Sequence, residues 1–272
     1  MTKNLGLIFF ENPISRSYLE ICKINNFKFK KIIVLQKRKF FSNYISQYYN
    51  FYKMNSHALN FIKDEKFKKI ISEISSFFGF SNNFFSSSYS LKNLKLFSND
   101  VSYLQTENID STSFINEITN NNDINFLNTG NKIYKEIFNH QGKIIHIHPG
   151  YLPNIRGADA SLWNIKRYNF LGVSSFIMDK KIDNGQILFK DKFIMPKFNF
   201  TFLKNYNFKT IYRFWFSFVD PLIRAKHLEK NFLKVNGKNL DLDIEVKEET
   251  NYFSYMDPKS VIETTKKVFQ ID

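Results

Sequence analysis

Residues 143–188 read KIIHIHPGYLPNIRGADASLWNIKRYNFLGVSSFIMDKKIDNGQIL. The apolar run at 144–147 is typical of a buried strand, and a Pro-Gly pair ends it. Six of the nine glycines in the chain lie between Gly130 and Gly185. Because glycine permits tight turns and close backbone approach, this concentration indicates that the chain folds here around a ligand or a catalytic site.

The residues before this stretch alternate between strand and helix patterns. Leu5–Phe10 (LGLIFF) and residues 31–35 (KIIVL) are continuous apolar runs, typical of parallel strands covered on both faces. Further strands are expected at residues 101–104 and 123–127, and helices at 15–24, 58–78, 111–118 and 131–138. This order predicts a Rossmann-like α/β fold with an open, mostly parallel sheet. No glycine-rich dinucleotide motif follows the first strand, so NAD binding is not expected.

The last part of the chain has a different character. We expect a catalytic domain at residues 1–195 and a small α+β segment at 196–272. The segment opens with an aromatic helical pattern at 208–218, and Asp220-Pro221 has the residues that cap and open a further helix. Two later stretches, 240–246 and 252–256, follow a turn at 236–237 and are typical of a small hairpin.

Composition excludes several classes of protein. The single cysteine, Cys22, cannot form an internal disulfide and fits a reducing compartment. Neither a signal segment nor an apolar run long enough for a membrane span is visible, so a cytoplasmic protein without a membrane partner is expected. The net charge of +14 comes from scattered lysines. Nucleic-acid binding is therefore not expected, whereas small anionic ligands suit such a surface.

Two histidines and an aspartate form the candidate site. His146 and His148 are two residues apart on one strand, so their side chains share a face at its carboxyl end, where open α/β sheets bind ligands. Asp183 lies in a turn after the next strand. Histidines with a structural role, a metal site of two His and one carboxylate, and acid–base catalysis without metal all fit this pattern.

The order of short motifs resembles the N10-formyltetrahydrofolate-dependent formyltransferases. That family has Asn-x-His-Pro/Ser at a strand end, then Leu-Leu-Pro-x-x-Arg-Gly, a Gly-Val-Thr strand and Asp-x-Gly-x-Ile. The corresponding residues here are HIHPG (146–150), YLPNIRG (151–157), GVS (172–174) and DNGQI (183–187). The resemblance favours acid–base catalysis over a metal, and the first ~190 residues resemble the family core more weakly as a whole.

The resemblance implies roles for particular residues. His148 matches the catalytic histidine of the family and Asp183 its catalytic aspartate. His146 stands where the family has an asparagine that donates a hydrogen bond to the oxyanion. An imidazole can also donate, and does so better when protonated, so His146 is the candidate oxyanion donor.

The resemblance also implies a formyl donor, the co-substrate N10-formyltetrahydrofolate. It would lie across two loops, formed by Thr129, Gly130 and Asn131 and by Asp183, Asn184 and Gly185. An amine would accept the formyl group.

The aromatic, helical tail loosely resembles the sugar N-formyltransferases. It therefore implies a nucleotide-linked amino sugar as the acceptor and a homodimer, to which Tyr212, Phe214 and Trp215 would contribute unless they lie in the core. Alternatives are another amine acceptor such as methionyl-tRNA or hydroxyornithine, a metal-dependent hydrolase that uses His146, His148 and Asp183, or a relative that binds without catalysis.

Overall fold

The computed structural model describes residues 4–36, 42–106, 108–132, 134, 143–233 and 240–270. Two predicted features lie mostly or wholly outside these ranges: the helix at 131–138 and the turn at 236–237. Within these ranges, none of the helices has the length and apolar character that crossing a membrane requires.

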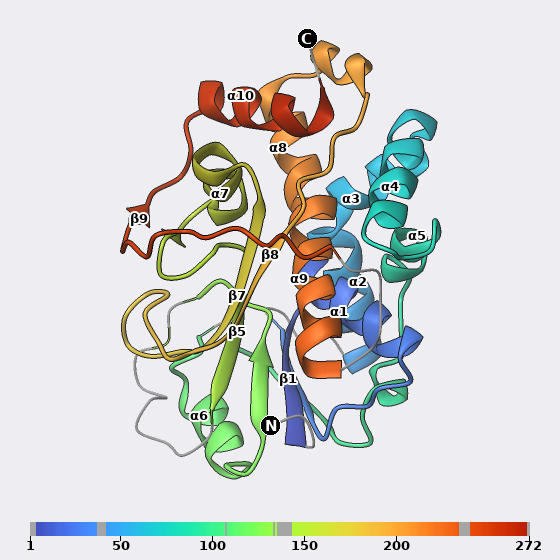
Figure 1. The fold of residues 1–272 in the computed structure, drawn as a ribbon. Helices are drawn as coiled ribbons and strands as arrows, with labels where there is room; N and C mark the ends of the chain where they lie inside the picture. Colours follow the sequence, from blue (N-terminus) through green and yellow to red (C-terminus); the bar gives the residue numbers. More distant parts are fainter. Residues whose placement is uncertain are drawn as a thin grey trace.

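A seven-stranded mixed sheet forms the centre of the molecule (Figure 1), with the strand order β3-β2-β1-β4-β5-β7-β8. The first five strands in this order are parallel, and β7 runs antiparallel to both of its neighbours. This confirms the predicted Rossmann-like α/β fold. The strands are β1 (Leu5–Phe10), β2 (Ile32–Leu35), β3 (Val101–Leu104), β4 (Asn125–Asn128), β5 (Ile144–His148), β7 (Leu171–Ile177) and β8 (Ile187–Phe193).

Hydrophobic cores cover both faces of the sheet. Alternate residues of β1 divide between them, because neighbouring side chains of a strand point to opposite faces: Leu7 and Phe9 lie in the larger core, and Ile8 in the smaller. The helices are α1 (Pro13–Ile24), α2 (Asn43–Met54), α3 (Ser56–Lys63), α4 (Glu65–Phe77), α5 (Phe84–Ser88), α6 (Thr112–Thr119), α7 (Ala160–Tyr168), α8 (Phe208–Phe214), α9 (Asp220–Leu228) and α10 (Pro258–Phe269), with short 3-10 turns at Leu94–Leu96 and Thr201–Asn205.

The expected helix at 58–78 is two helices, because Asp64 ends α3 and caps α4. The Asp64 carboxylate accepts from the amides of Lys66 at 2.9 Å and Phe67 at 3.4 Å. An aspartate inside an apolar helical pattern can therefore mark the boundary between two helices, because its carboxylate can accept from the first amides of the second helix.

The chain remains helical from α8 to Leu233, which contradicts the predicted cap at Asp220-Pro221. A π-helical turn, Trp215–Val219, joins α8 to α9, and a second one, Glu229–Leu233, follows α9. The π-helical turn lies just before Pro221. Because proline has no amide hydrogen, it cannot donate the backbone hydrogen bond of a regular α-helix, and the wider turn accommodates it. Asp220 therefore lies inside a continuous helix, and its side chain is available for other bonds.

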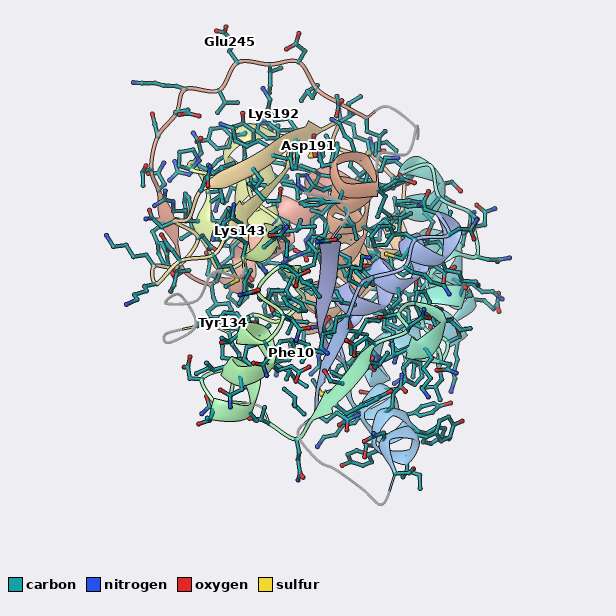
Figure 2. All side chains as sticks on the ribbon, turned by 90° about the horizontal axis from the view of Figure 1, so that it is seen from below. Phe10, Tyr134, Lys143, Asp191, Lys192 and Glu245 are labelled. Carbon is teal, nitrogen blue, oxygen red and sulfur yellow. The ribbon has the colours of Figure 1, made fainter. Side chains whose placement is uncertain are left out.

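The predicted C-terminal hairpin does not form in the described residues. Instead, Leu242 donates its amide to Lys192 O at 2.7 Å, and Ile194 donates to Leu240 O at 2.8 Å, so this stretch lies along the edge strand β8. Figure 2 shows Lys192 on the sheet and Glu245 at the periphery. A short strand β9, Tyr252–Phe253, pairs in parallel with β6, Arg156–Gly157. These pairings cover an edge that would otherwise be open to other chains.

The C-terminal part shares the larger core with the rest of the chain. Helix α9 packs against α1, β5 and β7, and Phe218 and Leu222 belong to the same hydrophobic cluster as Leu7 of β1. The division at residue 195 stays a prediction. What the packing establishes is that α9 lies against the strand that carries the two histidines.

Candidate active site

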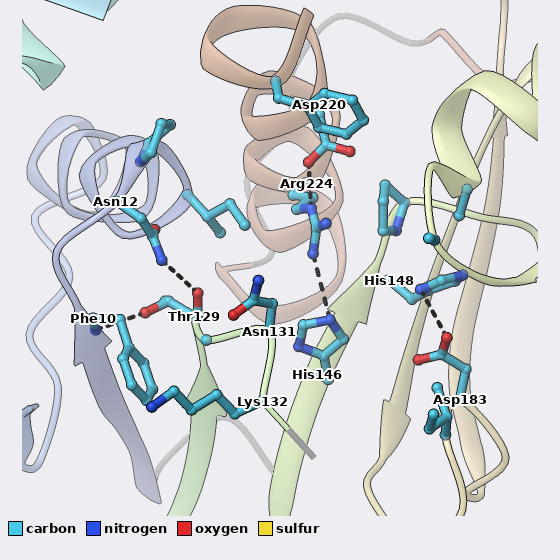
Figure 3. Close-up of a pocket in the computed structure, with 18 of the residues that line it drawn as sticks. Phe10, Asn12, Thr129, Asn131, Lys132, His146, His148, Asp183, Asp220 and Arg224 are labelled. Carbon is cyan, nitrogen blue, oxygen red and sulfur yellow. Dashed lines mark hydrogen bonds and ion pairs between the residues drawn. The ribbon is translucent and has the colours of Figure 1, made fainter. Parts of the chain in front are cut away.

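A cavity of about 830 Å³ lies where the carboxyl ends of β1, β4 and β5 meet (Figure 3). The order of the strands reverses at this point: the chain adds β2 and β3 on one side of β1, and β4 and β5 on the other side. This place is the switch point of the sheet. Open α/β sheets bind ligands at such a switch point. His146, His148 and Asp183 all line this cavity, so the structure brings the three predicted residues together.

His148 contacts two acceptors from its buried position. Its Nε2 lies 2.9 Å from the carbonyl oxygen of Ile155, and its Nδ1 lies 3.6 Å from Asp183 Oδ2. Because a carbonyl oxygen only accepts, Nε2 carries a hydrogen. The remaining nitrogen, Nδ1, therefore faces the carboxylate, and protonation of the ring would place a hydrogen on that side as well.

Gly150 allows this arrangement of the histidine ring. A Cβ atom at Gly150 would lie 2.8 Å from His148 Nε2 and 2.8 Å from the oxygen of Ile155. Any larger residue would therefore push the ring away from the carbonyl. This is the physical reason for a glycine after His148-Pro149 at the end of the strand.

The Asp183 turn is held by the loop that precedes α7. Asp183 adopts a left-handed backbone with φ of 49°, and its Oδ2 accepts from the amide of Gly157 at 2.9 Å. Arg156 Nη1 donates to Asn184 Oδ1 at 2.5 Å. Arg156 and Gly157 thus fix the two loops against each other, which places the carboxylate beside His148.

The Asp183 carboxylate is ionised at neutral pH. Burial by itself would raise its pKa, but the charge on His148 and the hydrogen bond from Gly157 outweigh burial. The pKa of Asp183 therefore lies below its ordinary value. An ionised carboxylate next to an imidazole is suited to accept and return protons.

The predicted cofactor-binding residues separate into two groups. Thr129, Gly130 and Asn131 line the cavity, whereas Asn184 and Gly185 do not. Asn184 holds Arg156, and Gly185 lies against the carbonyl oxygen of Ile177. The second loop therefore presents Asp183 to the cavity and uses its next two residues for internal contacts.

Thr129 fixes the switch point with all of its polar groups. Its Oγ1 accepts from the amide of Phe10 at 3.0 Å and donates to Ile8 O at 2.9 Å, and its carbonyl oxygen accepts from Asn12 Nδ2 at 2.7 Å. Asn12 also caps α1 by accepting from the amide of Ser15 at 2.9 Å. Asn12 lines the cavity and was not predicted, although its position between a strand and Pro13 is the sequence signal of an N-cap.

His146 lies beside a cation that the sequence analysis missed. Arg224 Nη1 lies 3.5 Å from His146 Nε2 and donates to Ile147 O at 2.5 Å. Burial first, and then the charge of Arg224, lower the pKa of His146 to about 3. His146 is therefore a neutral ring at physiological pH, which argues against the protonated donor considered from the sequence.

Helix α9 supplies Arg224 and its partner Asp220, and both line the cavity. Arg224 Nε donates to Asp220 Oδ1 at 2.7 Å, and Ser161 Oγ donates to Asp220 Oδ2 at 3.2 Å. An Asp and an Arg four residues apart usually form an exposed helical ion pair, so the spacing alone gave no signal of a site. Only the packing of α9 onto β5 reveals it.

The metal-hydrolase alternative does not fit the geometry. Among the residues that the structure describes, no three His, Cys, Asp or Glu side chains are arranged to hold a metal ion together. His148 Nε2 faces a backbone carbonyl, and His146 Nε2 faces a guanidinium. A cation beside Arg224 would also be repelled.

Tyrosines and a further aspartate, Asp159, also line the cavity. Asp159 accepts from the Tyr212 hydroxyl at 2.6 Å and from the amide of Met256 at 2.8 Å. Tyr252 and Tyr255 are 60% and 77% exposed and line the cavity from the C-terminal segment. Phe214 and Trp215 are buried in the core. They are therefore not available for the homodimer contact that the aromatic helix led us to expect.

Neither a protein-family model nor a curated protein sequence matches this chain. Solved structures with a similar fold include an N-formyltransferase from Helicobacter canadensis in complex with folinic acid and dTDP-3-aminofucose, at 14% identity over 98% of this chain and 80% of that chain, with a TM-score of 0.45. A sugar N-formyltransferase from Shewanella sp FDAARGOS_354 is 13% identical over 92% of this chain and 76% of that one, with a TM-score of 0.44. A phosphoribosylglycinamide formyltransferase from Streptococcus pneumoniae TIGR4 is 14% identical over 86% and 98%, with a TM-score of 0.43.

Proposed function

We propose that this protein is an N-formyltransferase that moves a formyl group from N10-formyltetrahydrofolate to the amine of a nucleotide-linked amino sugar. The observation that carries the proposal is the meeting of His148 and Asp183 at 3.6 Å on the wall of the switch-point cavity. These are the two residues to which the formyltransferase motifs assign catalysis. The cavity of about 830 Å³ is in the size range of small-molecule sites.

The reaction requires one net proton transfer. The neutral amine attacks the formyl carbon, a C–N bond forms, and the carbonyl oxygen becomes an oxyanion. When the oxyanion collapses, the bond from the formyl carbon to N10 breaks, and N10 takes up a proton. Asp183 is ionised and can accept the amine proton and return it to N10, and His148 lies beside the carboxylate with its Nδ1 at 3.6 Å from Asp183 Oδ2.

The rim of the cavity fits an anionic, aromatic acceptor. Lys53 and Lys181 lie on its lining with the exposed rings of Tyr252 and Tyr255. Lysines attract phosphates, and exposed tyrosines provide faces for a base or a sugar ring. These features support a nucleotide-linked sugar as the acceptor. The homodimer stays a prediction, which light scattering of the purified protein would test.

Turnover with defined acceptors tests the proposal. Purified protein is incubated with N10-formyltetrahydrofolate and a panel of nucleotides that carry 3-amino or 4-amino sugars, with glycinamide ribonucleotide, hydroxyornithine and methionyl-tRNA for comparison. We expect tetrahydrofolate release and a formylated sugar with at least one nucleotide sugar. Activity should persist in EDTA and fall at least about 100-fold in His148→Ala and Asp183→Ala, as expected for acid–base residues.

The outcomes separate the alternatives. Formylation of methionyl-tRNA or hydroxyornithine alone would reject the sugar acceptor and keep formyl transfer. Absence of turnover with every acceptor, together with absence of folate binding, would reject the proposed function as a whole.

A further inference from the structure

Arg224 is held in the cavity wall by three contacts. Nε donates to Asp220 at 2.7 Å, and Nη1 donates to Ile147 O at 2.5 Å and lies 3.5 Å from His146 Nε2. The side chain is 10% exposed, and Figure 3 shows it between Asp220 and His146. An arginine fixed in this way loses little further conformational freedom when it binds a ligand.

The contact with Arg224 decides what His146 can do. A guanidinium has no acceptor, so the ring nitrogen that faces it must present its lone pair. The neutral ring then carries its hydrogen on Nδ1. His146 Nε2 is therefore an acceptor, which is the opposite of the role that the asparagine of the formyltransferase motif has.

Arg224 retains donors that none of the described residues uses. Its Nη1 and Nε groups have the partners named above, whereas no described residue accepts from Nη2. The charge of Arg224 also acts on Asp183, so the guanidinium lies within electrostatic range of the His148–Asp183 pair. A fixed positive charge at this range is the type of group that stabilises a developing anion.

We propose that Arg224 is the catalytic residue that stabilises the oxyanion of the formyl group, and that His146 and Asp220 are positioning residues that hold its guanidinium. The inference rests on the proposed function, because it assigns the oxyanion of that reaction. It replaces the sequence-based role of His146 as the donor. A cation from α9 thus provides the stabilisation that an asparagine on the strand provides in the motif.

The test compares Arg224→Gln and Arg224→Lys with Arg213→Gln. Arg213 is exposed on α8 and does not line the cavity, so its variant controls for the loss of one arginine charge. We expect Arg224→Gln to lower kcat by about 100- to 1,000-fold, the loss typical of one oxyanion donor. The KM for N10-formyltetrahydrofolate should change by less than about threefold, and Arg213→Gln should match wild type.

Rescue by a small molecule distinguishes catalysis from structure. Guanidinium ion added to Arg224→Ala should restore kcat by about tenfold or more, whereas sodium at the same ionic strength should not. Arg224→Lys keeps the charge, and we expect it to retain more kcat than Arg224→Gln. If Arg224→Gln fails to fold, as judged by thermal unfolding, the lysine variant and the rescue decide the question.

Two results have different meanings. A wild-type protein that turns over while Arg224→Gln keeps kcat within about threefold would overturn the role of Arg224 and leave the formyltransferase proposal standing. A wild-type protein without turnover or folate binding would reject the proposed function itself.

Discussion

Asp183 has a backbone conformation that costs free energy in a non-glycine residue. Its φ of 49° is in the left-handed region, which aspartate tolerates better than most residues. The Gly157 amide at 2.9 Å and the adjacent His148 hold it there. The structure thus maintains an unfavourable conformation in order to place a carboxylate at the cavity, and such conformations concentrate at functional sites.

The ionisation of Asp183 gives a pH prediction. Its folded pKa lies below the ordinary 3.8, so the carboxylate stays charged above that value and is protonated only as the pH falls toward the lowered folded pKa. Asp183→Asn keeps the shape and tolerates the backbone, but cannot accept a proton. We expect kcat to fall by about 100- to 10,000-fold. The ratio of wild-type to variant kcat should be constant from pH 5 to pH 8.

Rates measured across that range decide the point. A ratio that approaches one near pH 5 would mean that Asp183 is protonated there. Its proposed role as the base would then be wrong.

At the scale of elements, the pairing of β6 with β9 connects the C-terminal segment to the active-site loop. Ala158 donates its amide to Phe253 O at 3.0 Å, and the ring of Trp163 stacks on Phe253 at 4.8 Å. Gly157 has a φ of 94°, and a Cβ there would lie 2.1 Å from the oxygen of Phe253. Only glycine therefore allows β9 to pair and leaves the Gly157 amide free for Asp183.

Gly157→Ala should release this contact. We expect it to destabilise the fold by about 1–3 kcal/mol, the usual cost of a strained backbone. The fluorescence of Trp163 should shift as Phe253 withdraws, and kcat should fall because the displaced backbone moves the amide of residue 157 away from Asp183. Gly79→Ala is the matched control, because Gly79 also has a positive φ, 81°, but lies after α4, away from this contact.

The two variants can have equal free energies of unfolding in denaturant, but only Gly157→Ala should lose kcat. Wild-type kcat in Gly157→Ala would show that the β6–β9 pairing does not position Asp183.

Local patterns predicted most strands and the helices with clear caps, because apolar runs and capping residues are local in sequence. Asp257, for example, caps α10 as Asp257-Pro258 suggests. The hairpin prediction was wrong because the backbone of residues 240–253 found partners in β8 and β6. A sequence pattern shows that a stretch is extended, but not which strand it will pair with.

At the scale of the whole molecule, buried polar contacts connect distant parts of the chain to one another. His227 of α9 lies 2.5 Å from Asp191 of β8. Asp191 is labelled in Figure 2. Burial would raise the pKa of Asp191, but its hydrogen bonds with His227 and Lys230 lower it to about 2. Arg16 of α1 is fully buried, and its Nη1 donates to Ser90 O at 3.2 Å while its Nε donates to Glu11 Oε1 at 2.7 Å. These contacts fix α9 and α1 beside the cavity.

This scale also explains why the sequence predicted only part of the site. His148 and Asp183 belong to short motifs, so their meeting could be anticipated. Arg224 reaches the cavity only because α9 packs across β5, which brings it against His146, 78 residues earlier in the chain. No local pattern contains such a contact. Asn12 lies beside the cavity for the same kind of reason, since β1 and β4 are neighbours in the sheet but distant in the chain.

Binding of a formyl folate tests the central claim most directly. Calorimetric titration of the wild-type protein with folinic acid, a stable formylated folate, should give one site with a dissociation constant near the micromolar range, about −8 kcal/mol. Thr129→Val should weaken binding by about tenfold, because Thr129 fixes the loop at the switch point. Thr119→Val in α6, whose hydroxyl bonds Ile115 O away from the cavity, should bind like wild type. Absence of binding by the wild-type protein at millimolar ligand would contradict the account.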